Sequence, residues 1–245
     1  MKYYLPEHEE GYARLRAEGK ASWGQLHGDA TFEDSEIRAV LAEALPLAKF
    51  DAPAPRALEY GCGTGPGACL LASRGMRVTG VDLSPTAIDL ARTEAARRGF
   101  SIDFAVADVV AAPPAFDREF DLVVDSFCLQ CIVTDGDRGR VFEFVRRALK
   151  PRGWYLIATA GFSPHRDYGR DLFDPATGIA MEPLDGPAER YEGAAVRIGE
   201  RWYLPSRRHV TVDALSGELH RAGFTVRWTR VAPDDGDLAV LARFA

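Results

Sequence analysis

Five short apolar runs along the chain alternate with amphipathic segments of helical period. The runs cover residues 57–60, 77–81, 102–106, 120–125 and 154–159. Each is bounded by glycine, proline or charged residues, which is typical of strands buried on both faces. The intervening segments 67–74, 85–98 and 137–149 place their apolar residues at helical spacing. This alternation predicts a parallel sheet covered by helices.

The segments on either side of these runs have other patterns. Residues 11–20 can form a short helix, and apolar spacing predicts another from Asp34 or Ser35 to Leu47. Residues 161–210 are rich in proline, glycine and aromatic residues without a clear period, which is typical of a lid or binding loop. Within them, 195–198 and 201–204 indicate a hairpin. A helix after Thr211 and a hairpin of residues 224–231 and 238–244 complete the pattern.

The stretch from Ala57 to Gly67 carries the strongest chemical signal. Its apolar run includes Glu59 and breaks at once into alternating glycines. Glycine permits positive φ and lets a ligand approach the backbone closely, so the stretch predicts a tight turn that binds a small ligand. The next apolar run ends in Asp82, where a parallel sheet presents a carboxylate to a ribose. Turn and acid together predict a nucleotide-type site.

Two cofactors fit this turn. Residues 63–68 match the G-x-G-x-x-A form of the dinucleotide fingerprint, in which a pyrophosphate binds at a helix N-terminus. S-adenosylmethionine instead carries a sulfonium, an ammonium and a carboxylate, and no phosphate. Glu59 would repel a diphosphate but could accept a hydrogen bond from the methionine ammonium. Pro66 removes a backbone donor that a phosphate cradle would use. Both residues favour S-adenosylmethionine.

With an acid, one further residue and alternating glycines, residues 59–67 resemble motif I of the class I S-adenosylmethionine-dependent methyltransferases. The resemblance covers about residues 55–159 and 211–244. It includes the turn at 150–153, where Arg152 replaces a glycine of the family pattern.

The resemblance implies an α/β fold: a Rossmann-like, seven-stranded, mostly parallel sheet with helices on both faces, an antiparallel last strand, and a lid insertion after strand five. We expect a single domain over residues 1–245. Its parts would be an N-terminal arm (1–52), a core (53–160 and 211–245) and a substrate lid (161–210).

The resemblance also implies which residues bind the cofactor. Asp108 would accept a hydrogen bond from the exocyclic amine of adenine, with Val109 beside the ring. The segment after strand four would pass beneath the cofactor toward its methyl group. The implied cofactor-binding set is Glu59, Gly61, Cys62, Gly63, Gly65, Asp82, Leu83, Asp108, Val109, Asp125 and Ser126.

Aromatic and cationic residues are the candidates for the acceptor side. In small-molecule methyltransferases an N-terminal segment commonly folds over the cofactor, which makes Tyr12, Trp23 and His27 candidates for closing the site. The alternative for these residues is an aromatic anchor for a terminal arm. The expected substrate-lining residues are Trp23, His27, Phe127, Tyr203 and Arg207.

Some of the candidate residues on the acceptor side also have a purely structural interpretation. For Tyr203 and Arg207 the alternative is a solvated, arginine-rich hairpin, because surface cations are the norm. A hydroxyl acceptor would also need a general base, for which His165 is our candidate, although a lone histidine is more often structural. A thiol or free amine acceptor would need no such base.

Charge and composition narrow the choice of partner. The net charge is −6, which disfavours extended contact with nucleic acid phosphates. The chain also lacks the (Asn/Asp)-Pro-Pro-aromatic stretch by which nucleobase amine methyltransferases are known. Its longest apolar stretches, such as 154–161, are shorter than the roughly 20 residues of a membrane helix. We expect a cytoplasmic protein with a small-molecule partner and neither a nucleic acid nor a membrane partner.

The chain has four cysteines, of which Cys128 and Cys131 have C-x-x-C spacing. No second such pair and no histidine pair completes a zinc set, so no metal is expected. Structural or site-lining thiols are the favoured interpretation, and redox or metal use is the alternative.

These expectations combine in one function, the transfer of a methyl group from S-adenosylmethionine to an O, N or S atom of a small molecule by in-line displacement. A nicotinamide-dependent reductase and a non-catalytic S-adenosylmethionine-binding module are the alternatives. The pattern leaves the acceptor, its nucleophilic atom and the oligomeric state open.

Overall fold

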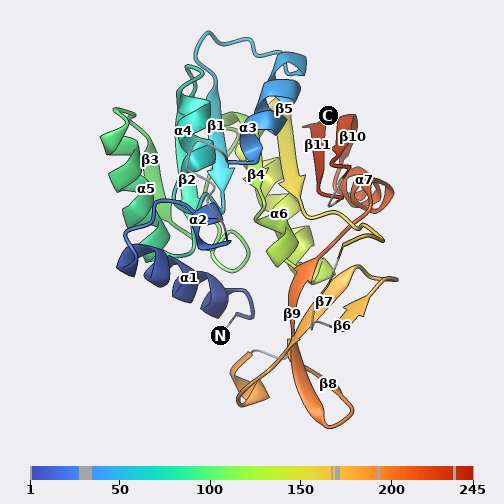
Figure 1. Ribbon diagram of the computed structural model, residues 1–245. Helices are drawn as coiled ribbons and strands as arrows, with labels where there is room; N and C mark the ends of the chain where they lie inside the picture. Colours follow the sequence, from blue (N-terminus) through green and yellow to red (C-terminus); the bar gives the residue numbers. More distant parts are fainter. Residues whose placement is uncertain are drawn as a thin grey trace.

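A seven-stranded sheet forms the centre of the protein, in a computed structural model that describes residues 2–27, 35–166, 168, 172–191, 194–233 and 236–244 (Figure 1). The strand order is β10-β11-β5-β4-β1-β2-β3. Neighbouring strands from β5 to β3 are parallel, and β11 is antiparallel to both β5 and β10. The strands are β1 (Arg56–Tyr60), β2 (Arg77–Asp82), β3 (Asp103–Val106), β4 (Phe120–Ser126), β5 (Leu149–Thr159), β10 (Phe224–Val231) and β11 (Leu238–Phe244).

Helices cover both faces of this sheet, because the strands bury side chains on both sides. Leu58 and Tyr60 belong to one hydrophobic cluster, which α6 (Asp135–Ala148) and α7 (Val212–Arg221) complete. Ala57 belongs to the opposite cluster, which contains side chains of α3 (Ile37–Ala44), α4 (Pro66–Ala72) and α5 (Pro85–Arg97). Burial on two faces explains the nearly continuous apolar runs of the strands. The predicted fold class is confirmed.

The sheet has its topological switch point between β1 and β4. From β1 the chain continues outward through β2 to β3, and then returns to add β4 and β5 on the other side. In open parallel sheets, ligands bind at the carboxyl ends of the strands at such a point, because the connecting loops diverge there and leave room. The loops after β1, β2 and β4 therefore define the expected site.

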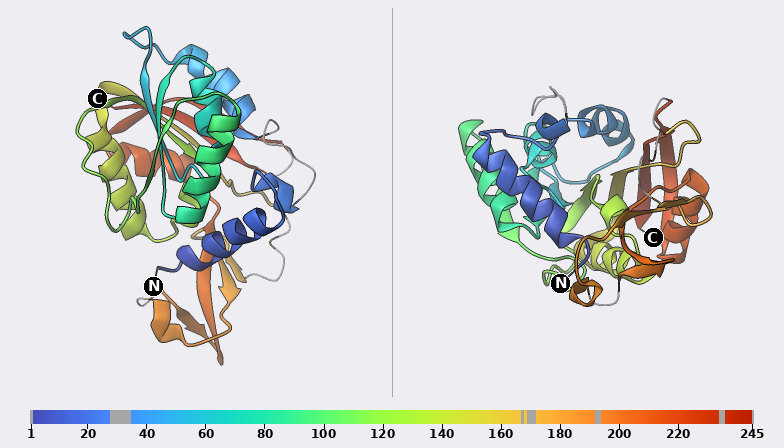
Figure 2. Two further views of the ribbon diagram at one scale, coloured as in Figure 1. Left: turned by 90° about the vertical axis from the view of Figure 1, so that its left-hand side faces the viewer. Right: turned by 60° about the horizontal axis from the view of Figure 1, so that its bottom comes forward.

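The N-terminal arm lies across this end of the sheet (Figure 2). It contains α1 (Leu5–Ala17) and the short α2 (Gly24–His27). The helix expected at residues 11–20 begins earlier, at Leu5, with a proline in its first turn and Glu7 favouring the helix N-terminus. The helix expected up to Leu47 runs from Ile37 to Ala44 and continues as a 3-10 turn, η2 (Leu45–Leu47); Asp34 lies outside the described residues.

The insertion after β5 contains a second sheet, of order β6-β7-β9-β8 and antiparallel throughout. The expected hairpin is β8 (Val196–Ile198) and β9 (Arg201–Arg208). Its partners β6 (Leu172–Asp174) and β7 (Ile179–Pro183) were not predicted, because neither short strand has a continuous buried face. Two 3-10 turns, η3 (Leu129–Cys131) and η4 (Ala188–Tyr191), complete the described elements. No helix among the described residues is long and apolar enough to span a bilayer.

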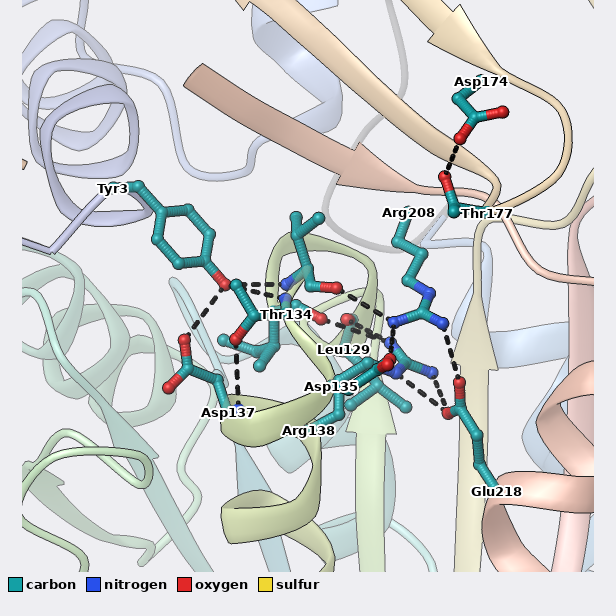
Figure 3. Close-up of polar contacts among 12 residues, drawn as sticks. Tyr3, Leu129, Thr134, Asp135, Asp137, Arg138, Asp174, Thr177, Arg208 and Glu218 are labelled. Carbon is teal, nitrogen blue, oxygen red and sulfur yellow. Dashed lines mark hydrogen bonds and ion pairs between the residues drawn. The ribbon is translucent and has the colours of Figure 1, made fainter. Parts of the chain in front are cut away.

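Ion pairs tie this second sheet to the core (Figure 3). Glu218 of α7 accepts from Arg138 of α6 at 2.6 and 2.9 Å, and its other oxygen lies 3.4 Å from Arg208 of β9. Arg208 also donates to the Val133 carbonyl at 3.0 Å and to Asp135 at 2.5 Å. The side chain of Arg138 is only 2% exposed, so Glu218 neutralises a cation that cannot reach bulk water.

We predict that Glu218→Ala lowers the free energy of unfolding by about 3–5 kcal/mol, because it leaves Arg138 buried without its counter-ion. Urea denaturation measures the change. Glu143→Ala on the exposed face of α6 is the control and should change stability by less than about 0.5 kcal/mol. Equal losses of unfolding free energy for the two substitutions would show that the buried Arg138–Glu218 pair stabilises the fold no more than an exposed side chain does.

Candidate cofactor and acceptor site

The loop after β1 forms the floor of the site. Gly61 and Gly63 have φ of 59° and 53°, values that favour glycine. A Cβ on Gly61 would lie 2.4 Å from the Cys128 side chain, and one on Gly63 would lie 2.8 Å from the Tyr12 hydroxyl. The loop thus needs glycine both for its turn and because the Cys128 and Tyr12 side chains approach its backbone closely. Gly65 then caps α4 in a left-handed conformation.

Asp82, at the end of β2, holds this loop. Its Oδ2 accepts from the Gly63 N–H and its Oδ1 from the Ser84 N–H, each at 2.9 Å. The side chain is buried, and burial raises its pKa while these two backbone donors lower it. Asp82 therefore connects the ends of β1 and β2. It lies where the sequence placed it, and its contact with a ribose stays a prediction.

Glu59 lies beneath the loop rather than in it. A Cβ on Gly67 would meet its Oε1 at 2.0 Å, and the Ala68 N–H donates to the carboxylate. Its Oε2 is buried without a partner among the described residues. Burial raises the pKa of Glu59 to about 8. A cationic ligand group would lower this pKa again and be stabilised by the ionised carboxylate, whereas an anionic pyrophosphate would gain no such attraction.

The end of β4 carries a third buried acid. Asp125 Oδ1 accepts from the Cys128 and Leu129 N–H groups at 2.9 and 3.1 Å, and its Oδ2 has no partner among the described residues. Burial raises its pKa to about 7. Ser126 ends the strand, and Phe127 follows with a φ of 62°, a left-handed conformation that costs a bulky residue energy. Such strain is typical of segments shaped for a ligand.

The arm helix α1 covers these loops. The Tyr12 side chain is buried with its hydroxyl against Gly63, and Tyr4 donates to Asp108 Oδ2 at 3.0 Å. Glu9 contacts the hydroxyls of Ser84 and Thr86, so the helix is also fastened to the start of α5. The expected closure by the arm is consistent with these contacts. Asp108, which the resemblance assigns to adenine, already accepts from Tyr4.

Sequence reasoning singled out Tyr12 but missed Tyr4 and His8. A signal was present, because residues 4, 8 and 12 are spaced by four and so share one face of a helix. His8 stacks on Trp23 with ring centroids 5.8 Å apart, and Trp23 also contacts Tyr12 at 5.2 Å. The structure thus brings Trp23 to the site together with α1.

The other candidates from the sequence are placed as follows. Cys62 and Val109 are buried, Leu83 is half-buried, and Arg207 of β9 pairs with Glu7 of α1 at 2.7 and 2.8 Å. Tyr203 is half-buried in β9 opposite Val196. His165 is exposed on the turn after β5, and its role as a base stays a prediction. His27 ends α2, with a side chain outside the described part of the structure.

Three of the four cysteines gather near the floor of the site. Cys62 follows Gly61, Cys128 packs on that glycine, and Cys131 ends η3. All four cysteines are free thiols. No group of three or more histidine, cysteine, aspartate or glutamate side chains is arranged to hold a metal ion within the described ranges.

Comparison with known proteins finds a similarity in the segment of the chain that carries this site. A family model described as a methyltransferase domain matches residues 57–153, which span β1 to the start of β5. This match agrees with the methyltransferase resemblance of residues 59–67. Solved structures of similar fold include some with S-adenosylhomocysteine or S-adenosylmethionine bound.

Three similar proteins illustrate the range of this domain class. The chain is 33% identical over 150 residues to a release factor glutamine methyltransferase of Koribacter versatilis, covering 51% of this chain and 50% of that protein. It is 33% identical over 104 residues to a ubiquinone biosynthesis O-methyltransferase of Thiobacillus denitrificans, covering 42% and 44%. The chain thus spans about half the length of these curated relatives.

The third is a solved structure. The 1,6-didemethyltoxoflavin-N1-methyltransferase of Burkholderia thailandensis, with its substrate and S-adenosylhomocysteine bound, superimposes with a TM-score of 0.59 at 20% identity. The match covers 98% of this chain and 91% of that one. At this identity the likeness establishes the fold alone, including the arm and the insertion.

The residues present fit the cofactor of the domain class. The glycine loop leaves bare backbone, Asp82 and Asp108 lie at the ends of neighbouring strands, and Glu59 has a buried oxygen without a partner in the described structure. An unpaired carboxylate oxygen favours a cationic ligand group over a phosphate. This charge pattern agrees with S-adenosylmethionine.

We predict that Glu59 makes stability fall as pH rises. Its folded pKa of about 8 exceeds the ordinary value of 4.5, so the folded state binds the extra proton between these values. Relative to Glu59→Gln, the wild-type free energy of unfolding should decrease by about 1.4 kcal/mol per pH unit across that window. Urea denaturation at pH 5.5, 6.5 and 7.5 measures this difference, with Asp89→Asn on exposed α5 as the control. Parallel pH profiles for wild type and Glu59→Gln would contradict a raised pKa.

Proposed function

We propose that this protein transfers the methyl group of S-adenosylmethionine to a small-molecule acceptor. The observation that carries the proposal is the convergence of the glycine loop, Asp82 and Asp108 beneath α1. Each comes from the carboxyl end of a different parallel strand. The methyltransferase domain match covers the same segment.

Each part of this constellation has a role in the proposal. Asp82 would accept from the ribose hydroxyls, Asp108 from the adenine amine, and Glu59 would face the methionine ammonium. When bound, S-adenosylmethionine supplies an electrophilic methyl group on a sulfonium. The protein then has to orient the acceptor in line with that methyl group and exclude water, and orientation of this kind can supply most of the catalysis. The closed helix α1 provides the exclusion.

The acceptor side points to a small molecule. Arm and insertion meet at the Glu7–Arg207 ion pair, so α1 and β9 contact each other beside the site. The net charge of −6 disfavours extended contact with nucleic acid phosphates. Two of the similar proteins are named for small-molecule acceptors, whereas the release factor enzyme is named for a protein glutamine. We assign acceptor choice to residues 161–210 and closure to residues 1–52.

We predict that S-adenosylmethionine and S-adenosylhomocysteine raise the melting temperature and that NADH does not. At 100 times Kd, binding to the native state adds about 2.7 kcal/mol, a shift of roughly 5–11 °C for a chain of this size. The Asp82→Asn variant should weaken binding by about 1.5–3 kcal/mol, because it removes a charged acceptor. Asp89→Asn is the matched control.

The outcomes separate the alternatives. A rise in melting temperature with NADH alone would overturn the cofactor assignment and favour a reductase. Binding of S-adenosylmethionine without turnover of any acceptor in a panel of phenols, amines and thiols would favour a non-catalytic binding module. Unchanged affinity of Asp82→Asn for S-adenosylmethionine would show that the Asp82 carboxylate does not bind the cofactor.

A further inference from the structure

The two oxygens of the Asp108 carboxylate have different partners. Oδ1 accepts from the Val110 and Ala111 N–H groups at 2.8 and 3.0 Å, which fixes the carboxylate on the loop after β3. Oδ2 accepts from the Tyr4 hydroxyl at 3.0 Å and has no other hydrogen bond among the described residues. The same hydroxyl lies 3.3 Å from Oδ1. The oxygen that the backbone leaves for a ligand is therefore the one that Tyr4 binds.

The Tyr4 side chain is firmly held at this position. It is 4% exposed, and its ring meets that of Tyr3 edge-on with centroids 5.0 Å apart. The Tyr3 hydroxyl accepts from the Val133 N–H at 2.8 Å, which anchors the start of the arm on the turn after β4. Burial raises the pKa of Tyr4, and the Asp108 carboxylate raises it further. The phenol therefore keeps its proton at neutral pH and acts as a donor.

Tyr12 lies over the neighbouring part of the site. Its side chain is 7% exposed, and a Cβ on Gly63 would lie 2.8 Å from its hydroxyl. The phenol thus rests on the bare backbone of the glycine loop, where the sequence predicts a small ligand. Protein interiors are close-packed, so a ligand and the Tyr12 ring cannot share this space. Two tyrosines of the arm therefore contact two separate parts of the expected cofactor site.

We propose that the arm is an internal competitor of the cofactor, with the Tyr4 hydroxyl on the Asp108 oxygen that the adenine amine would use and Tyr12 on the glycine loop. This inference rests on the proposed function, because it takes S-adenosylmethionine as the ligand. A phenol and an aromatic amine each offer a hydrogen to the carboxylate, so one replaces the other without leaving a buried oxygen unpaired. The cofactor enters when α1 moves away, and the helix then returns over it.

Contacts outside the site determine how firmly the arm is held. Glu7 pairs with Arg207 of β9 at 2.7 and 2.8 Å, and Glu9 accepts from the hydroxyls of Ser84 and Thr86 at the start of α5. Where only the displaced arm admits the ligand, the apparent Kd is the intrinsic Kd divided by the fraction of molecules with the arm displaced. Each contact that holds the arm therefore weakens the observed affinity for the cofactor.

Isothermal titration calorimetry of the full chain with S-adenosylhomocysteine tests the competition. Tyr4→Phe removes only the hydroxyl and frees the Asp108 oxygen, so we expect its Kd to be about 5-fold lower than that of wild type, the usual effect of one hydrogen bond. Tyr12→Ala empties the space over Gly63 and should also lower Kd. Glu10→Gln, an exposed residue of the same helix, is the control and should match wild type.

Binding kinetics distinguish a competitor from a cover that stabilises the bound cofactor. The Tyr4–Asp108 bond exists only in the free protein if the hydroxyl competes, so Tyr4→Phe should raise the association rate constant and leave the dissociation rate constant unchanged. Stopped-flow tryptophan fluorescence measures both, because Trp23 contacts Tyr12. Faster dissociation of Tyr4→Phe, with a raised Kd, would make the arm a stabilising cover and overturn the proposal.

A double-mutant cycle tests whether the hydroxyl acts through Asp108. In an Asp108→Ala background Tyr4→Phe should change Kd by less than about twofold, because the hydroxyl no longer has the partner for which it competes. A full effect in that background would overturn the assignment. If wild type binds S-adenosylhomocysteine and Tyr4→Phe leaves Kd unchanged, only the inference about the arm is wrong. If neither wild type nor the two tyrosine variants bind it, the proposed cofactor is wrong as well.

Discussion

The pair of hydrogen bonds accepted by Asp82 is the interaction on which the site depends. One oxygen binds the Gly63 N–H and the other binds the Ser84 N–H, so one carboxylate joins the loop after β1 to the start of α5. A backbone turn with positive φ has little intrinsic preference for one geometry. The buried acceptor supplies that preference. The glycine loop is therefore held ready for a ligand by its neighbouring strand.

Three buried acids, Glu59, Asp82 and Asp125, lie at this end of the sheet, and burial raises the pKa of each of them. The pKa values of Glu59 and Asp125 rise to about 8 and about 7, and that of Asp82 also rises. A folded chain that only needed stability would gain by replacing such groups with apolar ones. Their presence beneath a glycine loop agrees with the proposed ligand, S-adenosylmethionine, which offers cationic and hydroxyl groups.

The residues that cover the site come from parts of the chain that are far apart in sequence. Tyr4, His8 and Tyr12 reach it from α1, and Arg207 reaches it from β9 and is held there by Glu7. Arg208, the next residue along β9, pairs with Asp135 and Glu218 on the core helices. Arm, insertion and core are thus coupled by ion pairs that meet around the turn after β4. The position of the arm and the geometry of the turn after β4 therefore depend on each other.

Local pattern determined the core of this protein. The apolar runs, the alternating glycines and the acids that follow strands specified the parallel strands, the glycine turn after β1 and the place of Asp82, because these depend on neighbours within one βαβ unit. The β6–β7 hairpin, the Glu7–Arg207 ion pair and the occupation of Asp108 by Tyr4 depended on tertiary structure. Each is a contact between segments whose sequences carry no shared period, so only the folded chain brings them together.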